Sequence, residues 1–299
     1  MKWLIVGDGI QGKKRKQILG LNCIGILDPI SSTSEFKKIE DVKANYDIVA
    51  ICTSQNVKLE YLKYFIANGV PCLIEKPFPI ISDMEFHDIQ STCLSKNTFV
   101  YTAFNHRFEE SLVQLRQMIL DGTIGVPYYA HMRYGNGTVR DIISSPWKNS
   151  SDGLLFDLGS HLIDLHKYIF NSFGRELKIE SHTRSESQFP DYVRISGINL
   201  VMELGYIFWK SDFRIEIWGS NGSLHATGLK KWGNSKLILR SRNFPSGVPI
   251  EKVNKFRGID NTWELEHSFV ENLLSDNTIG VDSYVQELNN RLLGLSQNL

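Results

Sequence analysis

An acidic and a basic side chain, Glu75 and Lys76, stand side by side at the end of an apolar run, directly before Pro77 in LIEKPFP. A lysine can act as an acid or a base when burial or a nearby positive charge lowers its pKa toward neutrality. Consecutive residues of an extended segment point to opposite faces, and Pro77 disfavours the helical region for Lys76. We therefore expect Lys76 to be available for chemistry and Glu75 to be structural.

A second group pairs a carboxylate with an imidazole four residues away, as Asp157 and His161, in FDLGSHLIDLHKYIF. At that spacing both side chains share a helix face. His161 can donate to a substrate oxygen or relay a proton, while Asp157 orients the substrate or the imidazole. The alternative is a structural pair near a helix start, where the helix dipole favours Asp157. A metal site is not expected, because His166 faces elsewhere on such a helix.

The elements that would position these groups begin with a glycine-rich turn after the apolar residues 2–6. Gly7, Gly9 and Gly12 of GDGIQG match GxGxxG, which provides a tight turn, a close approach to a pyrophosphate and helix–strand packing. The next apolar run ends in Asp28, where a carboxylate can accept hydrogen bonds from an adenosine ribose. This pattern predicts a dinucleotide site and favours NAD, because the carboxylate repels the 2′-phosphate of NADP.

NADP stays possible as the cofactor because of two other features of this region. The serines of PISSTS (29–34) and the basic residues Lys13, Lys14 and Arg15 can tolerate a phosphate. The alternative for the basic cluster is a solvated first helical turn.

Strand-like and helix-like stretches alternate over the first hundred residues. Residues 46–54 predict a buried strand, 57–69 an amphipathic helix, and 70–77 another strand. The alternation predicts an α/β fold with a doubly wound parallel sheet, which binds ligands beyond the carboxyl ends of its strands. After residue 125, strand-like segments follow one another up to two helices around 261–275 and 283–295, which predicts a mainly antiparallel sheet.

Composition narrows the class of protein. The chain has 299 residues, 42% of them hydrophobic, with 33 acidic and 33 basic residues, so a nucleic-acid partner is not expected. The apolar stretch at the N-terminus is too short for a signal peptide, and no uncharged run has membrane-spanning length, so we expect a cytoplasmic protein without a membrane partner. The four cysteines contain no CxxC pair and are expected to be core thiols.

Taken together, these motifs resemble the glucose-fructose oxidoreductase and inositol dehydrogenase family (Gfo/Idh/MocA). The resemblance rests on GDGIQG, on ICTSQNVKLEYLKYFIANGVPCLIEKP, on FNHRF at 104–108 and on DGLLFDLGSHLID at 152–164. It implies an NAD-binding Rossmann domain at 1–104 and an α+β domain with a large, mainly antiparallel sheet at 105–299. Family members act on sugars, cyclitols or sugar nucleotides, and the resemblance implies a homodimer or homotetramer through the C-terminal sheet.

The resemblance also assigns roles to residues. Lys76 matches the acid/base lysine of the family's EKP motif, and Asp157 and His161 match its DxGxHxxD stretch. One departure is Lys58, which follows Thr53 and Ser54 where family members often have TP and then a histidine. A second is Asp152–Gly153 in place of a Gly-Gly pair.

The expected site combines two groups of residues and no metal. Cofactor contacts are expected from the glycine turn, the ends of later strands and the EKP motif: Gly7, Gly9, Ile10, Gln11, Gly12, Asp28, Thr53, Ser54, Glu75 and Lys76. Substrate contacts are expected from Asn105, Arg107, Trp147, Asp157 and His161. For Asn105 and Arg107 the alternative is a bracing role in the structure.

The sequence therefore predicts an NAD-dependent oxidoreductase that moves a hydride to or from a secondary hydroxyl or carbonyl of a sugar-like substrate. Lys76 would be the general acid/base, assisted by His161 and Asp157. Two alternatives are a sugar-nucleotide reductase or dehydrogenase of surface-polysaccharide biosynthesis and a non-catalytic regulator that senses a dinucleotide. The presence of both Lys76 and His161 argues against the regulator, which needs neither.

Overall fold

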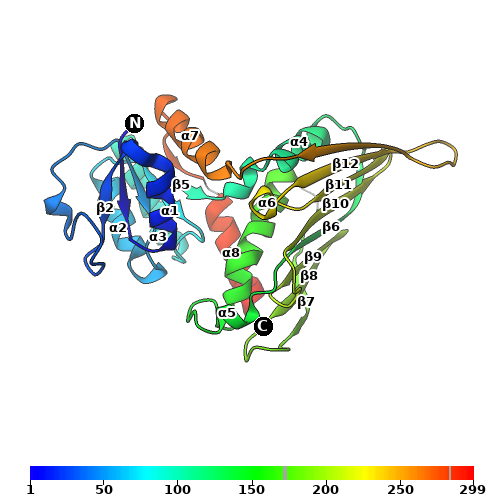
Figure 1. Ribbon diagram of the computed structural model, residues 1–299, viewed down its shortest axis with the longest axis horizontal. Helices are drawn as coiled ribbons and strands as arrows, with labels where there is room; N and C mark the ends of the chain where they lie inside the picture. Colours follow the sequence, from blue (N-terminus) through cyan, green and yellow to red (C-terminus); the bar gives the residue numbers. More distant parts are fainter. Residues whose placement is uncertain (171–173, 283) are drawn as a thin grey trace. The chain divides into compact units, whose positions relative to one another are not determined.

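The computed structural model describes residues 1–170, 174–282 and 284–299 (Figure 1). The chain forms two compact units. The first unit comprises Met1–Asn105 and Asn261–Asn289, and the second comprises His106–Asp260 and Asn290–Leu299. The sequence predicted one continuous second domain over 105–299, and the structure differs by returning 261–289 to the first unit. This return adds a short strand and a helix to the first unit.

The first unit is built on a parallel sheet, as the alternating pattern predicted. In the described residues this sheet has six strands in the order β14-β5-β4-β3-β1-β2, and every paired neighbour is parallel. Its strands are β1 (Trp3–Val6), β2 (Cys23–Leu27), β3 (Ile48–Ile51), β4 (Cys72–Glu75), β5 (Phe99–Ala103) and β14 (Gly280–Val281). The central strands are apolar because both faces of the sheet are covered.

Helices cover both faces of the parallel sheet (Figure 1). The helices are α1 (Ile10–Leu19), α2 (Gln55–Ala67), α3 (Asp83–Lys96) and α7 (Thr262–Ser275). Leu62 of α2 and Ile89 of α3 belong to the core on one face, and Leu19 of α1 and Val270 of α7 belong to the core on the other. The first unit is thus the predicted doubly wound sheet, with α7 supplied from late in the chain.

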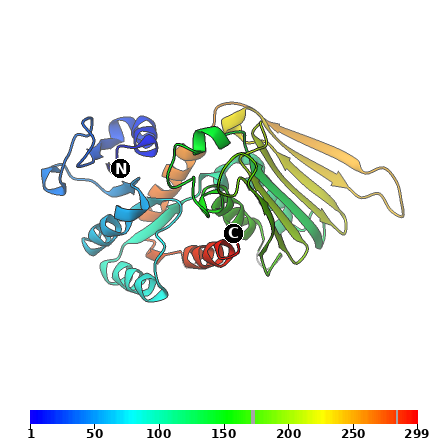
Figure 2. The ribbon, with the colours of Figure 1, turned by 90° about the horizontal axis from the view of Figure 1, so that it is seen from below.

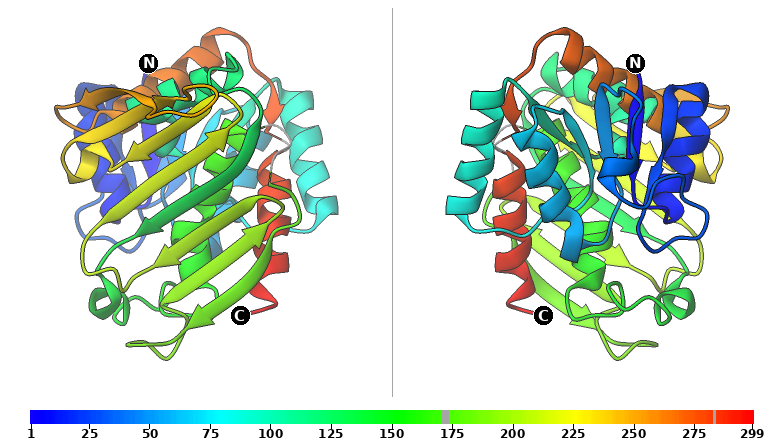
Figure 3. Two further views of the ribbon diagram at one scale, coloured as in Figure 1. Left: turned by 90° about the vertical axis from the view of Figure 1, so that its right-hand side faces the viewer. Right: turned by 90° about the vertical axis from the view of Figure 1, so that its left-hand side faces the viewer.

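The second unit carries the large, mainly antiparallel sheet (Figures 2 and 3). Among the described residues this sheet has eight strands in the order β13-β12-β11-β10-β6-β9-β8-β7, in which β6 and β9 pair in parallel. The strands are β6 (Pro127–Gly135), β7 (Lys178–Thr183), β8 (Tyr192–Gly197), β9 (Leu200–Gly205), β10 (Asp212–Gly219), β11 (Gly222–Thr227), β12 (Ser235–Ser241) and β13 (Ile250–Phe256). The predicted α+β architecture of this part is confirmed.

One face of the large sheet is packed and the other is polar. Along β10, Phe213, Ile215 and Ile217 are buried while Arg214 and Trp218 are exposed, the alternation expected of a half-covered sheet. The helices of this unit are α4 (Glu110–Leu120), α5 (Val139–Ile142) and α6 (Ser160–Ile169), and α8 (Tyr284–Ser296) runs through both units. Helices α4 and α6 contact each other and the strands of the sheet.

Two further expectations concern the whole chain. All four cysteines lie among the described residues and have free thiols, and Cys72 and Cys93 are fully buried, as expected of core thiols. Across 1–170, 174–282 and 284–299, none of the helices is both long and apolar enough to cross a bilayer.

Candidate functional site

The glycine-rich turn joins β1 to α1. Gly7 has φ of +102°, and a Cβ there would lie 2.8 Å from the carbonyl oxygen of Cys52. A Cβ on Gly12 would lie 1.9 Å from the carbonyl oxygen of Gly7, whereas a Cβ on Gly9 would meet no atom within 4 Å. The first and third positions therefore require glycine for packing, and the backbone at Gly9 is open to a ligand. This geometry fits the pyrophosphate of a dinucleotide.

Asp28 directly follows β2 and binds three backbone amides. Its Oδ2 accepts from the N–H of Asp8 at 2.9 Å, and its Oδ1 accepts from the N–H groups of Ile30 and Ser31 at 2.9 and 3.0 Å. Burial raises the pKa of Asp28, but these donors outweigh it and the net shift is downward. Asp28 is therefore ionised at neutral pH beside the glycine turn.

A second carboxylate, Asp8, lies next to Asp28, and the sequence analysis did not single it out. Asp8 is 7% exposed and accepts hydrogen bonds from the hydroxyls of Ser31 and Thr33, which lower its pKa. The Ser31 hydroxyl was expected to be able to tolerate a phosphate; instead it binds a carboxylate, as does the Thr33 hydroxyl. Asp8 could have been predicted from its position inside the glycine motif, between Gly7 and Gly9.

Arg15 was expected either to face a phosphate or to lie in a solvated helical turn, and both expectations are wrong. It is fully buried, with Nε 2.7 Å from Oε1 of Glu75 and Nη2 2.9 Å from Oε2 of Glu266. Its Nη1 lies 2.7 Å from Nε2 of His267. Burial and the neighbouring guanidinium lower the pKa of His267 to about 3, so its neutral ring accepts the hydrogen bond.

Glu75 is the last residue of β4, and Lys76 directly follows it. The Glu75 carboxylate is held by Arg15, which makes it the structural member of the pair. Lys76 is half-buried, and the Lys76–Pro77 peptide bond, whose isomer the sequence left open, is cis. Because parallel sheets bind ligands at the carboxyl ends of their strands, Lys76 stands where the chemistry of this unit is expected.

The backbone on both sides of Lys76 is held by a buried lysine of α2. Lys58 is 2% exposed, and its Nζ donates to the carbonyl oxygen of Glu75 at 2.7 Å and to that of Pro77 at 3.0 Å. Gln55, one turn earlier, also donates to the Pro77 carbonyl at 3.1 Å. Burial lowers the pKa of Lys58 to about 8, although Glu75 opposes the shift. Lys58 is a departure from the family pattern, and no role was predicted for it.

The rest of this loop is held from α8. Nδ2 of Asn289 donates to the carbonyl oxygens of Phe78 and Pro79 at 3.3 and 2.9 Å, and Nε2 of Gln286 lies 3.3 Å from the carbonyl oxygen of Ile81. Proline lacks an N–H, so a loop rich in proline has fewer backbone donors for its own carbonyls. Side chains from two helices supply the missing donors.

In the second unit, Asp157 lies on a π-helical turn, Leu155–Gly159, that leads into α6. Its Oδ2 accepts from Nζ of Lys148 at 2.8 Å and from the hydroxyl of Tyr206 at 3.2 Å. Burial and the Asp157 charge raise the pKa of Tyr206, so Tyr206 remains a hydroxyl donor. Asp157 thus has two side-chain partners, whereas a carboxylate that only stabilises a helix start needs none. In addition, π-helical turns recur at functional sites.

His161 lies on α6 within a cluster of aromatic rings. Its ring stacks on His106, with centroids 4.3 Å apart, and lies edge-on to Tyr134. The Tyr134 hydroxyl is 3.2 Å from Nε2 of His106 and accepts from Nζ of Lys231 at 2.7 Å. Burial raises the pKa of Tyr134, so it stays protonated. Lys231 was not among the predicted site residues, because KKW (230–232) carries no motif.

The remaining predicted residues differ in their surroundings. Arg107 donates through Nε to Oδ2 of Asp164 at 3.0 Å, and Asn105 donates to the Thr262 hydroxyl at 2.9 Å, so each has a bracing contact within its own unit. Trp147 is 51% exposed and available to a ligand. Substrate contact by these residues stays a prediction.

The loop after β3 supports the cofactor site through an unsatisfied group. Oγ1 of Thr53 is buried, and none of the described residues gives it a hydrogen-bond partner. Ser54 is the N-cap of α2, while Ile10 and Gln11 are exposed at the start of α1. A buried hydroxyl without a partner at the carboxyl end of a strand is a position that a bound ligand can satisfy.

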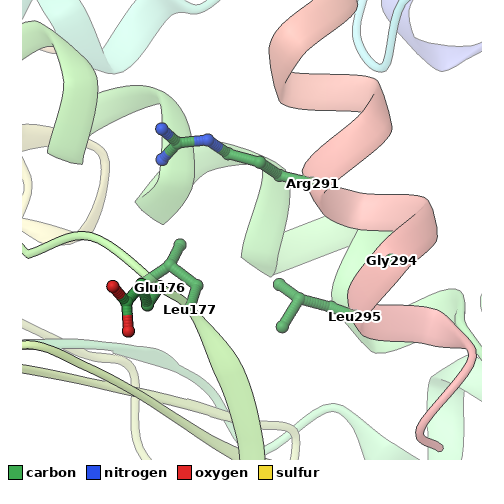
Figure 4. Close-up of a pocket in the computed structure, with 5 residues that line it drawn as sticks. All are labelled: Glu176, Leu177, Arg291, Gly294 and Leu295. Atoms are coloured by element: carbon green, nitrogen blue, oxygen red, sulfur yellow. The ribbon is translucent and has the colours of Figure 1, made fainter.

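Two other kinds of site were considered. In the part of the chain that the structure describes, no group of three or more His, Cys, Asp or Glu residues is arranged to hold a metal. The second unit has a hollow of about 350 Å³, into which Arg291 and Leu295 extend from α8 (Figure 4). Its lining contains none of the predicted site residues: Glu176, Leu177, Arg291, Gly294 and Leu295.

Part of the second unit matches a model of a known protein family. Residues 112–225 match the family model described as the GFO/IDH/MocA C-terminal domain. This part of the chain is therefore similar to a GFO/IDH/MocA C-terminal domain. A myo-inositol 2-dehydrogenase from Thermotoga maritima is 25% identical over 207 residues, which cover 64% of this chain and 59% of that relative. The chain thus matches about three fifths of this curated relative, and the resemblance to the Gfo/Idh/MocA family is confirmed.

Solved structures show the same fold over nearly the whole of this chain. A UDP-N-acetylglucosamine 3-dehydrogenase from Acidithiobacillus ferrooxidans has a TM-score of 0.81 at 14% identity and covers 100% of this chain and 97% of its own. An oxidoreductase from Agrobacterium radiobacter, in complex with NAD⁺, L-tartaric acid and magnesium, has a TM-score of 0.78 at 15% identity, covering 99% and 94%. The predicted two-part architecture is therefore confirmed.

Proposed function

We propose that the chain is an NAD-dependent oxidoreductase acting on the CH–OH group of a sugar, cyclitol or sugar-nucleotide-like substrate. One observation carries the proposal: a glycine turn open at Gly9 follows β1, and Lys76 follows β4 of the same parallel sheet. The family match supports it, as does the inositol dehydrogenase named among the relatives. The arrangement provides a dinucleotide cradle and an ionisable amine at one edge of the sheet.

The nicotinamide, when bound, supplies the hydride acceptor or donor. Lys76 takes the proton of the substrate hydroxyl during oxidation and returns it during reduction. His161 donates to the reacting oxygen, and the stacked His106 fixes the plane of its ring. Asp157 binds a neighbouring substrate hydroxyl while Lys148 and Tyr206 hold its carboxylate. These are the roles that the sequence predicted for Lys76, His161 and Asp157.

The cofactor we propose is NAD rather than NADP. Asp8 and Asp28 lie together next to the glycine turn, and hydrogen-bond donors lower the pKa of each carboxyl. Both are negatively charged at neutral pH, so a 2′-phosphate placed beside them would be repelled. Two of the groups expected to tolerate a phosphate, Ser31 and Arg15, are bound to carboxylates instead.

The test combines cofactor binding with turnover. NADH binding is followed by fluorescence, and oxidation or reduction is assayed with myo-inositol, other cyclitols, aldoses and UDP-N-acetylglucosamine. Lys76→Ala should lower turnover by about a thousandfold while the Kd for NADH stays within about threefold. Lys63→Ala is the matched control, because Lys63 pairs with Glu85 at the surface. Normal turnover by Lys76→Ala would reject the assignment of Lys76.

The panel also separates the alternatives. Preferential turnover of UDP-N-acetylglucosamine would favour the sugar-nucleotide enzyme, whose fold the A. ferrooxidans dehydrogenase shares. NADH binding without turnover of any panel member would favour the regulator. We also propose a homodimer or homotetramer through the open face of the large sheet, where the exposed rings of Tyr129 and Trp218 lie 5.8 Å apart. Light scattering of the purified chain measures its mass directly.

A further inference from the structure

Lys58 is a buried lysine whose hydrogen bonds meet the backbone immediately before and after Lys76. Its Nζ bonds the carbonyl oxygens of Glu75 and Pro77 at 2.7 and 3.0 Å, and Lys58 itself is 2% exposed. A buried lysine is costly unless its donors are satisfied. The two carbonyls satisfy two of its donors, so the contact is a specific clamp on residues 75 to 77.

The clamp acts where the loop cannot stabilise itself. Pro77 and Pro79 have no N–H, and the carbonyls of this loop accept from side chains of α2 and α8. Among the hydrogen bonds described for this loop, Lys58 alone bridges the Glu75 carbonyl, in the peptide group before Lys76, and the Pro77 carbonyl, in the peptide group that follows Pro77. A displacement of these peptides would carry the Cα of Lys76 with it, because Lys76 lies between them.

The charged groups around Lys58 are consistent with a fixed role. Glu75, which Arg15 holds, and the thiol of Cys52 favour its charged form, whereas burial and the nearby Lys76 oppose it, and the pKa falls to about 8. An ammonium has three donors and a neutral amine has two. Both carbonyl bonds can therefore be made in either protonation state of Lys58.

We propose that Lys58 is a positioning residue that fixes the backbone of Lys76 through the Glu75 and Pro77 carbonyls. The inference rests on the proposed function, in which Lys76 transfers the proton. A small displacement of a reacting group lowers the rate of the chemical step more than it lowers binding. Loss of the clamp should therefore change kcat and leave KM and cofactor affinity nearly unchanged.

The test compares Lys58→Met, which keeps the apolar stem and removes the donors, with Lys63→Met on the same helix. Lys63 is the control because its Nζ bonds Glu85 at the surface, 3.0 Å away. Hydrogen exchange of peptides covering residues 72–81 is measured by mass spectrometry, together with the Kd for NADH. Turnover, expressed per bound NADH, is measured with the panel substrate that the wild-type chain uses best.

For Lys58→Met we expect exchange over 72–81 to be at least about fivefold faster, and kcat to fall at least about tenfold with KM and the NADH Kd within about threefold. Lys63→Met should match the wild type. Unchanged exchange over 72–81, or an unchanged kcat, would overturn the inference. If Lys58→Met does not fold, Lys58→Gln, whose shorter amide cannot reach both carbonyls, carries the same expectations.

Failure of the proposed function gives a different result from failure of this inference. If the wild-type chain turns over no panel substrate, the proposed function fails. The exchange measurement still decides whether Lys58 clamps residues 75 to 77, because it needs no substrate.

Discussion

Arg15 donates through Nε to Oε1 of Glu75 at 2.7 Å, and its guanidinium is fully buried. The contact joins α1, directly after the glycine turn, to the end of β4, directly before Lys76. The same guanidinium bonds Glu266 of α7. The cofactor turn, the loop of Lys76 and the late helix α7 are therefore tied together by one buried charge and its two carboxylate partners.

Removing this charge should destabilise the chain strongly. Arg15→Met leaves the carboxylates of Glu75 and Glu266 buried without their cation, which costs about 3–5 kcal/mol of unfolding free energy. Urea denaturation followed by circular dichroism measures the change. Lys16→Met is the neighbouring control, because the Lys16–Glu35 pair is about 40% exposed at each side chain and should contribute less than about 1 kcal/mol. Equal losses of unfolding free energy in the two variants would show that the buried Arg15 pairs stabilise the chain no more than the exposed Lys16 pair does.

Lys58 should make stability depend on alkaline pH. Its pKa is about 8 in the folded chain against an ordinary value of 10.5. Between these pH values the unfolded chain binds more protons than the folded chain, so the contribution of Lys58 to the free energy of unfolding rises with pH. Below pH 8 Lys58 is charged in both states, and the full cost of burying its charge lowers stability. Relative to Lys58→Met, the wild type should gain about 2 kcal/mol between pH 7.5 and 9.5. Urea titrations of both proteins at the two pH values measure the gain, and a pH-independent difference would contradict it.

The local patterns that could be read from the sequence are those that repeat over short distances. Apolar runs alternating with amphipathic helices predicted the parallel sheet. The spacing of Gly7, Gly9 and Gly12 predicted a tight turn, and in the structure the backbone leaves no room for a side chain at Gly7 or Gly12. The alternation of side chains along an extended segment predicted that Glu75 and Lys76 would have different roles. Each inference used only residues within a few turns of one another.

The contacts that could not be predicted join distant parts of the chain. Arg15 bonds Glu266, 251 residues away, and Asn289 bonds the Pro79 carbonyl, 210 residues away. The sequence around Arg15 has the lysines of a solvated helix, so nothing local distinguishes the one side chain that is buried. Tyr206, whose hydroxyl lies 3.2 Å from the Asp157 carboxylate, likewise follows a strand, β9, with no recognisable motif.

Replacing Asp28 should weaken the preference for NAD. Asp28→Ser removes one of the two carboxylates beside the glycine turn and with it repulsion of a 2′-phosphate, so the ratio of NADPH to NADH affinity should rise at least about tenfold. Fluorescence titrations with the two reduced cofactors measure this ratio. Asp88→Ser on the exposed side of α3 is the control and should leave it unchanged. An unchanged ratio in Asp28→Ser would show that Asp28 does not select the cofactor.

Lys148 and Asp157 should act on the substrate as one unit. Nζ of Lys148 donates to Oδ2 of Asp157 at 2.8 Å, and the Tyr206 hydroxyl shares that oxygen. Lys148→Met and Asp157→Asn should each lower kcat/KM about tenfold or more, and the double variant should lose little beyond Asp157→Asn alone, a coupling of about 1–2 kcal/mol. The exposed Arg140, which pairs with Glu186, gives the control Arg140→Met. Additive losses would mean that Lys148 contacts the substrate independently, because a residue that acts by holding Asp157 has no effect once that carboxylate is gone.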